Sequence, residues 1–200
     1  MAARRLAAPV AIVLGLALLP GRAEAHAASA VVGDFYAGAL HLLTSPEYLL
    51  SLVGLGLLLG SGERDATAEP FLLLLPLALG IGAVLSLGTG PVAVPRFMGV
   101  FWLLFMGLLV AAAVRLPRPW LAVITTLLGL AHGFGNGQAM VPGMSVALFF
   151  PGVMLAGFVV TFYAMALAVR ATPFWAKIAV RVVGSWIAAT GILVLGMPAR

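Results

Sequence analysis

Long apolar segments are the feature that most limits what this chain can fold into. From Val31 onward, apolar runs of about 20 residues alternate with short turns rich in proline and glycine. Of the 200 residues, 63% are hydrophobic and 8% are charged, whereas soluble domains carry about 25% charged residues. Because a bilayer offers no water to an exposed backbone, segments of this kind span it as helices. The sequence therefore predicts an all-α, polytopic membrane helix bundle.

The N-terminal segment resembles a secretory signal peptide. Arg4 and Arg5 form a basic region, an apolar run extends from Val10 to Leu19, and Ala23-Glu24-Ala25 is a small-x-small cleavage site. We expect residues 1–25 to be removed, which leaves a single transmembrane domain over 26–200. The alternative is an uncleaved first helix, but the apolar run is short for a span.

The apolar runs predict about six membrane-spanning helices, of which the first is broken at Ser45-Pro46. Proline and glycine cluster between these runs and at their ends, as is typical of turns. The expected spans are Val31–Gly60 (broken), Pro70–Thr89, Val92–Val114, Pro119–Ala139, Gly143–Val169 and Phe174–Met197.

Lysine and arginine predict the orientation, since they accumulate in cytoplasmic loops. With the mature N-terminus outside, six basic residues fall inside and two, Arg96 and Arg200, fall outside. We therefore expect a multi-pass protein of a bacterial cytoplasmic (inner) membrane with a periplasmic N-terminus. Its basic residues are isolated, so nucleic acid is not an expected partner. The inside residues are Arg64, Arg115, Arg118, Arg170, Lys177 and Arg181.

The first span contains an unusual polar interruption between His41 and Tyr48. Ser45 is suited to cap a new helix, Pro46 is suited to its first position, and Glu47 then falls in the first turn. On a continuous helix, His41 and Glu47 would diverge by about 120° around the axis. A break lets them converge, and discontinuous helices of this kind build ion sites in transporters.

The fourth span carries the other concentration of polar residues at membrane depth. His132 and Asn136 share a helical face, and Gln138 follows His132 at the spacing by which Glu47 follows His41. The first and fourth spans run in opposite directions, as expected of three-plus-three inverted repeats. We expect His41 and His132 to face each other.

Small residues recur every fourth position in two spans, which favours close helix packing. One ridge consists of Gly82, Ser86 and Gly90. The other consists of Gly129, Gly133 and Gly137 and runs beside His132.

Four residues form the candidate metal site: His41, Glu47, His132 and Asn136. Imidazole nitrogen suits divalent first-row metals, and ionisable residues inside a membrane commonly mark ion pathways. The alternative at each position is a purely structural role, because a membrane histidine can simply hydrogen-bond a neighbouring helix. Secondary candidates are His26, Asp34 and Gln138, although Asp34 also fits a solvated or capping role and His26 an exposed terminus.

Two segments resemble the HupE/UreJ family of hydrogenase- and urease-associated membrane proteins. They are Gly33–Leu50, which contains Asp34, His41 and Ser45-Pro46-Glu47-Tyr48, and Ala131-His132-Gly133-Phe134-Gly135-Asn136-Gly137-Gln138-Ala139-Met140. This family is regarded as comprising nickel or cobalt permeases. The resemblance therefore implies transport of such an ion, with His41, Glu47 and His132 carried over as ligands.

The chain departs from the family pattern at several ligand positions. Leu42 stands in place of proline, Glu47 in place of aspartate, and Tyr48 in place of histidine. Phe134 and Asn136 replace two histidines of the later motif, and Ala139 stands where an acidic residue is common. Fewer imidazole ligands imply weaker or altered selectivity.

Three functions compete on this evidence. The first is a permease for a divalent transition metal ion, nickel or cobalt first, with the ion as cargo and no tightly bound cofactor. The second is a non-transporting accessory or assembly subunit with metalloenzyme-maturation partners. The third, an intramembrane metal-dependent hydrolase, is disfavoured because neither HExxH nor GxSxG occurs, so we expect no enzyme.

Expected partners are the lipid bilayer, the metal ion and a second copy of the chain.

Overall fold

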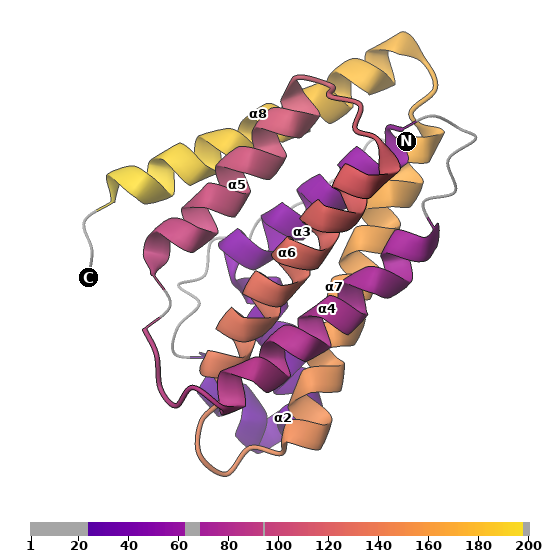
Figure 1. The fold of residues 1–200 in the computed structure, drawn as a ribbon. Helices are drawn as coiled ribbons and strands as arrows, with labels where there is room; N and C mark the ends of the chain where they lie inside the picture. The colour runs from indigo at the N-terminus through magenta and orange to yellow at the C-terminus, as the bar shows by residue number, and fades with distance from the viewer. Residues whose placement is uncertain (1–23, 63–68, 94, 198–200) are drawn as a thin grey trace, which may run out of the picture.

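The computed structural model describes residues 24–62, 69–93 and 95–197, so the predicted signal peptide lies almost entirely outside the described residues. The described residues fold into helices without any strand, which confirms the predicted fold class. Figure 1 shows the helices as α2 (Glu24–Thr44), α3 (Pro46–Gly60), α4 (Glu69–Leu87), α5 (Arg96–Ala111), α6 (Arg118–Gln138), α7 (Val146–Arg170) and α8 (Phe174–Gly196).

Three of these helices, α4, α7 and α8, are long and apolar enough to cross a membrane, and the bent pair α2–α3 passes the same test as a unit. The α5 helix is apolar but has only 16 residues. The α6 helix has 21 residues, but its second half carries glycine, histidine, asparagine and glutamine, which lower its apolarity. By length and apolarity, the described residues thus contain three membrane-spanning helices, or four spans if the bent pair counts as one, and the predicted number of about six is approximate.

The structure confirms the break in the first span. Ser45 is extended (φ −93°, ψ 106°), Pro46 opens α3, and the two helical segments are bent by 76°. This geometry follows from the sequence because the residue before a proline avoids the helical region. Ser45 occupies the N-cap position, but its hydroxyl makes no capping bond; instead it donates to the His41 carbonyl at 2.7 Å. Gly33 makes a second kink within α2, with a φ of 80° that favours glycine.

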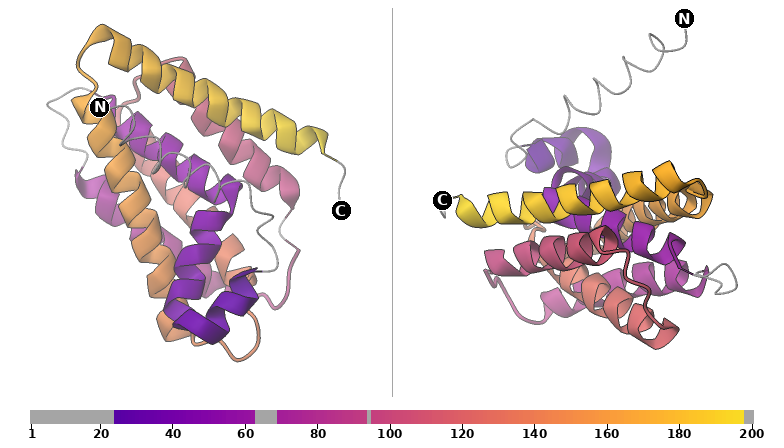
Figure 2. Two further views of the ribbon diagram at one scale, coloured as in Figure 1. Left: turned by 180° about the vertical axis from the view of Figure 1, so that it is seen from behind. Right: turned by 90° about the horizontal axis from the view of Figure 1, so that it is seen from above.

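The helices associate in pairs. Figure 2 shows α5 and α8 side by side along one flank, and α4 packs closely on α6. The α7 helix contacts both halves of the broken span, α2 and α3, and also α4. The pairing of α4 with α6 and of α7 with α2–α3 is compatible with an inverted three-plus-three repeat.

The predicted small-residue ridges form the α4–α6 contact. A Cβ atom added at Gly133 would fall on the backbone of Leu79, and one added at Gly82 would fall on the backbone of Leu130. The two helices can approach this closely only because neither position carries a side chain. Gly90 does not belong to the ridge, since it lies in the turn after α4 with a φ of 66°.

The third predicted span is shorter than expected at its start. The predicted helix begins at Val92, whereas α5 begins at Arg96. Pro91 and Pro95 flank the intervening residues and cannot donate backbone hydrogen bonds. The polypeptide between α4 and α5 is therefore a turn, and it lies against the end of α6.

Large apolar side chains cover the outside of the bundle. Trp186 is 72% exposed and Leu167 is 66% exposed. A soluble monomer rarely exposes apolar patches on this scale, whereas hydrocarbon tails are a favourable environment for them. The distribution supports a membrane location.

Candidate ion site at the helix break

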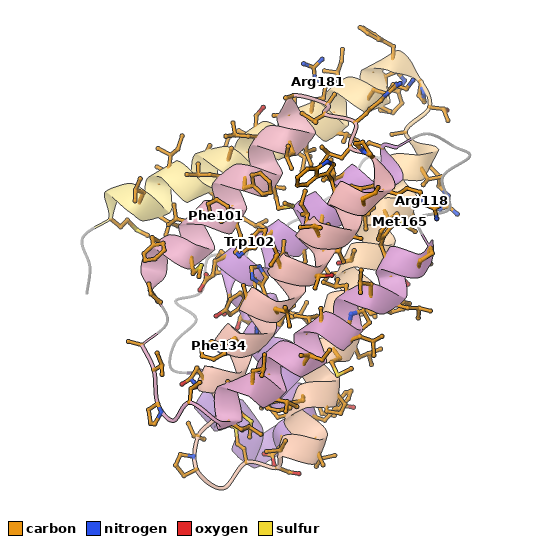
Figure 3. All side chains as sticks on the ribbon, in the orientation of Figure 1. Phe101, Trp102, Arg118, Phe134, Met165 and Arg181 are labelled. Carbon is orange, nitrogen blue, oxygen red and sulfur yellow. The ribbon has the colours of Figure 1, made fainter. Side chains whose placement is uncertain are left out.

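The break in the first span brings two helix ends to the middle of the bundle. His41 lies in the last turn of α2, and Glu47 and Tyr48 lie in the first turn of α3. His41 and Tyr48 face α6, which presents Asn136 and His132 to them. Trp102 joins them from α5, and Figure 3 shows it on the side of α5 that faces the bundle.

A short chain of hydrogen bonds links α2 to α6. The Nδ1 atom of His41 lies 2.9 Å from the Oδ1 atom of Asn136. The Nδ2 atom of Asn136 donates to the backbone carbonyl of His132 at 2.8 Å. Asn136 is fully buried, so both of its polar atoms are satisfied inside the protein.

Tyr48 lies against both histidine rings. Its ring centroid is 5.9 Å from that of His41 and 5.0 Å from that of His132. Its hydroxyl is seated over Gly135, where an added Cβ atom would overlap it. We expected His41 and His132 to face each other. In the structure the Tyr48 ring contacts both of them, and His41 forms its hydrogen bond with Asn136.

His132 is the most deeply buried ionisable group at the site. Its side chain is 1% exposed, and its Nε2 atom has no hydrogen-bond partner among the described residues. Its ring also interacts with the backbone of Glu47. The Nε1 atom of the adjacent Trp102 is likewise buried without a partner in this part of the chain. Because unpaired buried polar atoms are costly, these two nitrogens mark a place that can accept a polar guest.

Glu47 supplies the negative charge of the site. It is partly buried in the first turn of α3, and its Cβ and Cγ atoms lie against Gly99 of α5. The N-terminus of a helix favours an anionic side chain. The structure thus confirms the predicted position of Glu47 just after the break.

Two secondary candidates have structural roles instead. The Asp34 carboxylate accepts a hydrogen bond from the backbone N–H of Ser145 at 2.7 Å, at the start of α7. The Gln138 side chain accepts from the backbone N–H of Val92 at 2.9 Å and donates to oxygen atoms in the last turn of α4 and in the α4–α5 turn. The side chain of His26 lies outside the described residues.

The site is sparse as a metal centre. Among the residues that the structure describes, no three His, Asp or Glu side chains are gathered to hold a metal ion. What the break provides is a buried imidazole nitrogen, a second imidazole and one carboxylate, with an indole and a phenol around them. Such donors fit a divalent first-row metal, but with fewer ligands than a tight structural site uses.

Sequence reasoning missed Trp102 and gave Tyr48 only the role of a lost ligand. Trp102 lies in a helix whose polar residues gave no reason to place it beside the site.

Comparison with known proteins gives one result. The family model described as HupE / UreJ protein matches residues 14–194, which is nearly the whole chain. Searches of curated proteins and of solved structures gave no match.

Proposed function

The chain belongs to the HupE/UreJ family, and from this we propose that it is a permease for a divalent transition metal ion, with nickel or cobalt as the first candidates. The observation that carries the proposal is the break at Ser45, which places Glu47 next to the buried His132 and His41 next to Asn136, one turn along the same helix. Polar and ionisable groups at membrane depth are costly, and their usual function is an ion or substrate pathway.

The donor chemistry supports a transition metal over an alkali or alkaline-earth ion. His41 and His132 offer imidazole nitrogen, which first-row divalent ions prefer, whereas calcium and magnesium prefer oxygen ligands. Glu47 offsets part of the cation charge. A permease must release its cargo, so a site with few ligands suits transient binding.

The proposed setting is a bacterial cytoplasmic membrane with the mature N-terminus in the periplasm, after removal of residues 1–25. In this orientation, the ends of α4 and α6 and the start of α7 face the periplasm. His41 and His132 then lie toward the periplasmic half of the bundle. A homo-oligomer and metalloenzyme-maturation partners are part of the same proposal.

A second function, that of a non-transporting accessory subunit, is favoured by one observation. The described residues gather no three-ligand cluster, and Asn136, at a position where the family has histidine, is engaged in two hydrogen bonds. Such a subunit would keep the helix break but would no longer transport a metal ion.

Uptake measurements separate the two functions. Cells that lack other nickel and cobalt importers would express the wild type, His41→Ala, Glu47→Gln or the control Thr161→Val, which alters a buried hydroxyl on α7. We expect wild-type uptake of nickel or cobalt, a loss of at least about tenfold in the two site variants, and no loss in the control. Immunoblots of membranes verify equal amounts of protein.

Two results would contradict parts of this proposal. Unchanged uptake in both site variants would remove His41 and Glu47 from the pathway. Absence of uptake by the wild type, at normal membrane levels, would support the accessory subunit instead.

A further inference from the structure

We propose that Asn136 is a positioning residue, which holds His41 in the tautomer with hydrogen on Nδ1 and leaves Nε2 as its free electron-pair donor. The assignment of the tautomer stands on the hydrogen bonds alone. Its importance for metal binding rests on the proposed function.

The first step concerns the orientation of the Asn136 amide. Its Nδ2 atom lies 2.8 Å from the backbone carbonyl of His132. A carbonyl oxygen only accepts hydrogen bonds, so the atom facing it must be the amide nitrogen. The carbonyl of the same side chain, Oδ1, therefore faces His41.

The second step concerns the hydrogen on the imidazole. Asn136 Oδ1 lies 2.9 Å from His41 Nδ1 and can only accept. The Nδ1 atom must then be the donor. A neutral imidazole carries one N–H, so His41 Nε2 has a lone pair available to a ligand.

The third step concerns the backbone of the same residue. The Ser45 hydroxyl donates to the His41 carbonyl at 2.7 Å, across the break. His41 is thus held through its ring by α6 and through its carbonyl by the break itself. Metal-binding histidines are typically oriented in this way, by a hydrogen bond from the ring nitrogen that does not bind the metal.

This arrangement changes the role expected for Asn136. Asn136 is expected from the sequence to be part of the metal site, but its amide is fully buried and bonded at both ends. In the proposed role it touches the ligand rather than the ion. An asparagine can thereby occupy a position where the family has histidine and still contribute to metal binding.

The tautomer is measurable without any metal. The chain contains three histidines, so protein labelled with ¹⁵N-histidine and purified in detergent gives few imidazole signals, and His41→Ala identifies those of His41. At a pH where the ring is neutral, we expect Nδ1 to give the protonated, pyrrole-type signal and Nε2 the unprotonated, pyridine-type signal. The opposite assignment in the wild type would overturn the proposal.

Two variants test whether Asn136 sets the tautomer. Asn136→Asp keeps an oxygen acceptor for His41 Nδ1 and should preserve the pattern, whereas Asn136→Leu removes the acceptor and should convert His41 to a mixture of tautomers. Thr125→Val is the matched control, since Thr125 is fully buried on the same helix and its hydroxyl has no partner among the described residues. An unaltered pattern in Asn136→Leu would overturn the proposal. Helical circular dichroism verifies that each variant is folded.

A binding measurement then links the tautomer to the ion. Titration of the purified protein with cobalt(II) chloride, followed by visible absorption, should show affinity reduced by about tenfold to hundredfold in Asn136→Leu and largely restored in Asn136→Asp. Equal affinity in the wild type and Asn136→Leu would overturn the role toward the ion. If the wild type has the expected tautomer but binds no cobalt, the proposed function fails while the tautomer assignment stands.

Discussion

The broken unit α2–α3 and the continuous helix α6 contain the same spacing of polar residues but use it differently. His41 precedes Glu47, and His132 precedes Gln138, by the same number of residues. In α2–α3, the break turns His41 toward α6 and Glu47 toward α5. In α6, the unbroken backbone directs Gln138 to the end of α4 and the α4–α5 turn, where it forms four hydrogen bonds.

This difference shows that spacing alone does not define a site. The polar side chains of α6 mostly bind protein groups: Asn136 holds His41 and Gln138 holds a turn. Glu47, after the break, lies instead at the N-terminus of α3, with its Cβ and Cγ atoms against Gly99. In the proposed function, α6 would therefore serve mainly as a scaffold, while the broken unit would present groups to the ion.

The largest expected effect comes from breaking the scaffold at Gly133. In Gly133→Ala, the new methyl group would fall on the backbone of Leu79, and α4 and α6 could no longer pack. Backbone cannot move aside as a flexible side chain can, so we expect most of the folded protein to be lost. Fluorescence-detected gel filtration in detergent measures this loss.

The control for that experiment is Gly88→Ala, where an added methyl group meets only the Leu85 carbonyl oxygen at an ordinary 3.7 Å. It should elute as the wild type does. A monodisperse, thermally stable Gly133→Ala protein would contradict the close approach of the two helices.

The next effect tests the scaffold role of Gln138. Gln138→Leu removes four hydrogen bonds, one to the last turn of α4 and three to the α4–α5 turn, and it should lower the free energy of unfolding by about 2 kcal/mol, since each bond contributes modestly in a partly exposed place. Reversible unfolding in detergent measures this change in the free energy of unfolding. Wild-type stability would mean that the turn is held by other contacts.

A smaller loss of stability is expected at Asp34, whose carboxylate joins the broken unit to the start of α7. Asp34→Ala leaves the backbone N–H of Ser145, at the start of α7, without its carboxylate partner, and it should cost about 1 kcal/mol of stability, as losses of helix caps do. The same unfolding assay applies, with Asp34→Asn as the variant that retains an acceptor. Equal losses in both variants would indicate that charge, rather than the hydrogen bond, is responsible.

The smallest change in stability is expected at Glu47. This variant tests most directly whether the broken unit, unlike α6, contributes little to stability through its polar side chain. In Glu47→Leu, the Cβ and Cγ atoms that contact Gly99 are retained, and Ser51 bonds the backbone carbonyl of this residue, not its side chain. We expect a change within about 0.5 kcal/mol, or a gain, because a charge leaves the bilayer. A loss as large as that of Gln138→Leu would place Glu47 in the scaffold.

Much of the fold could be predicted because its causes are local. Apolar runs located the helices, and Pro46 with Ser45 located the break, since proline excludes the preceding residue from helical geometry. The glycine spacing predicted close packing, and the α4–α6 contact confirms it.

The site could be predicted only where residues share a helix. His132 and Asn136 were expected on one face, and they do meet the broken unit. Trp102 was missed because periodicity does not specify which helix lies beside which. The engagement of Gln138 was missed for the same reason: its partners belong to a turn that only the packed bundle brings near.

The restart of the helix at Pro46 has an electrostatic consequence for a bound cation. The aligned peptide dipoles of α3 amount to about half a positive charge at its N-terminus, which repels a metal ion. Glu47 in that same turn reverses the sign, so a cation beside it experiences roughly half a negative charge rather than a full one. A local charge this small would attract a divalent ion from water without retaining it, and the ion could therefore move onward.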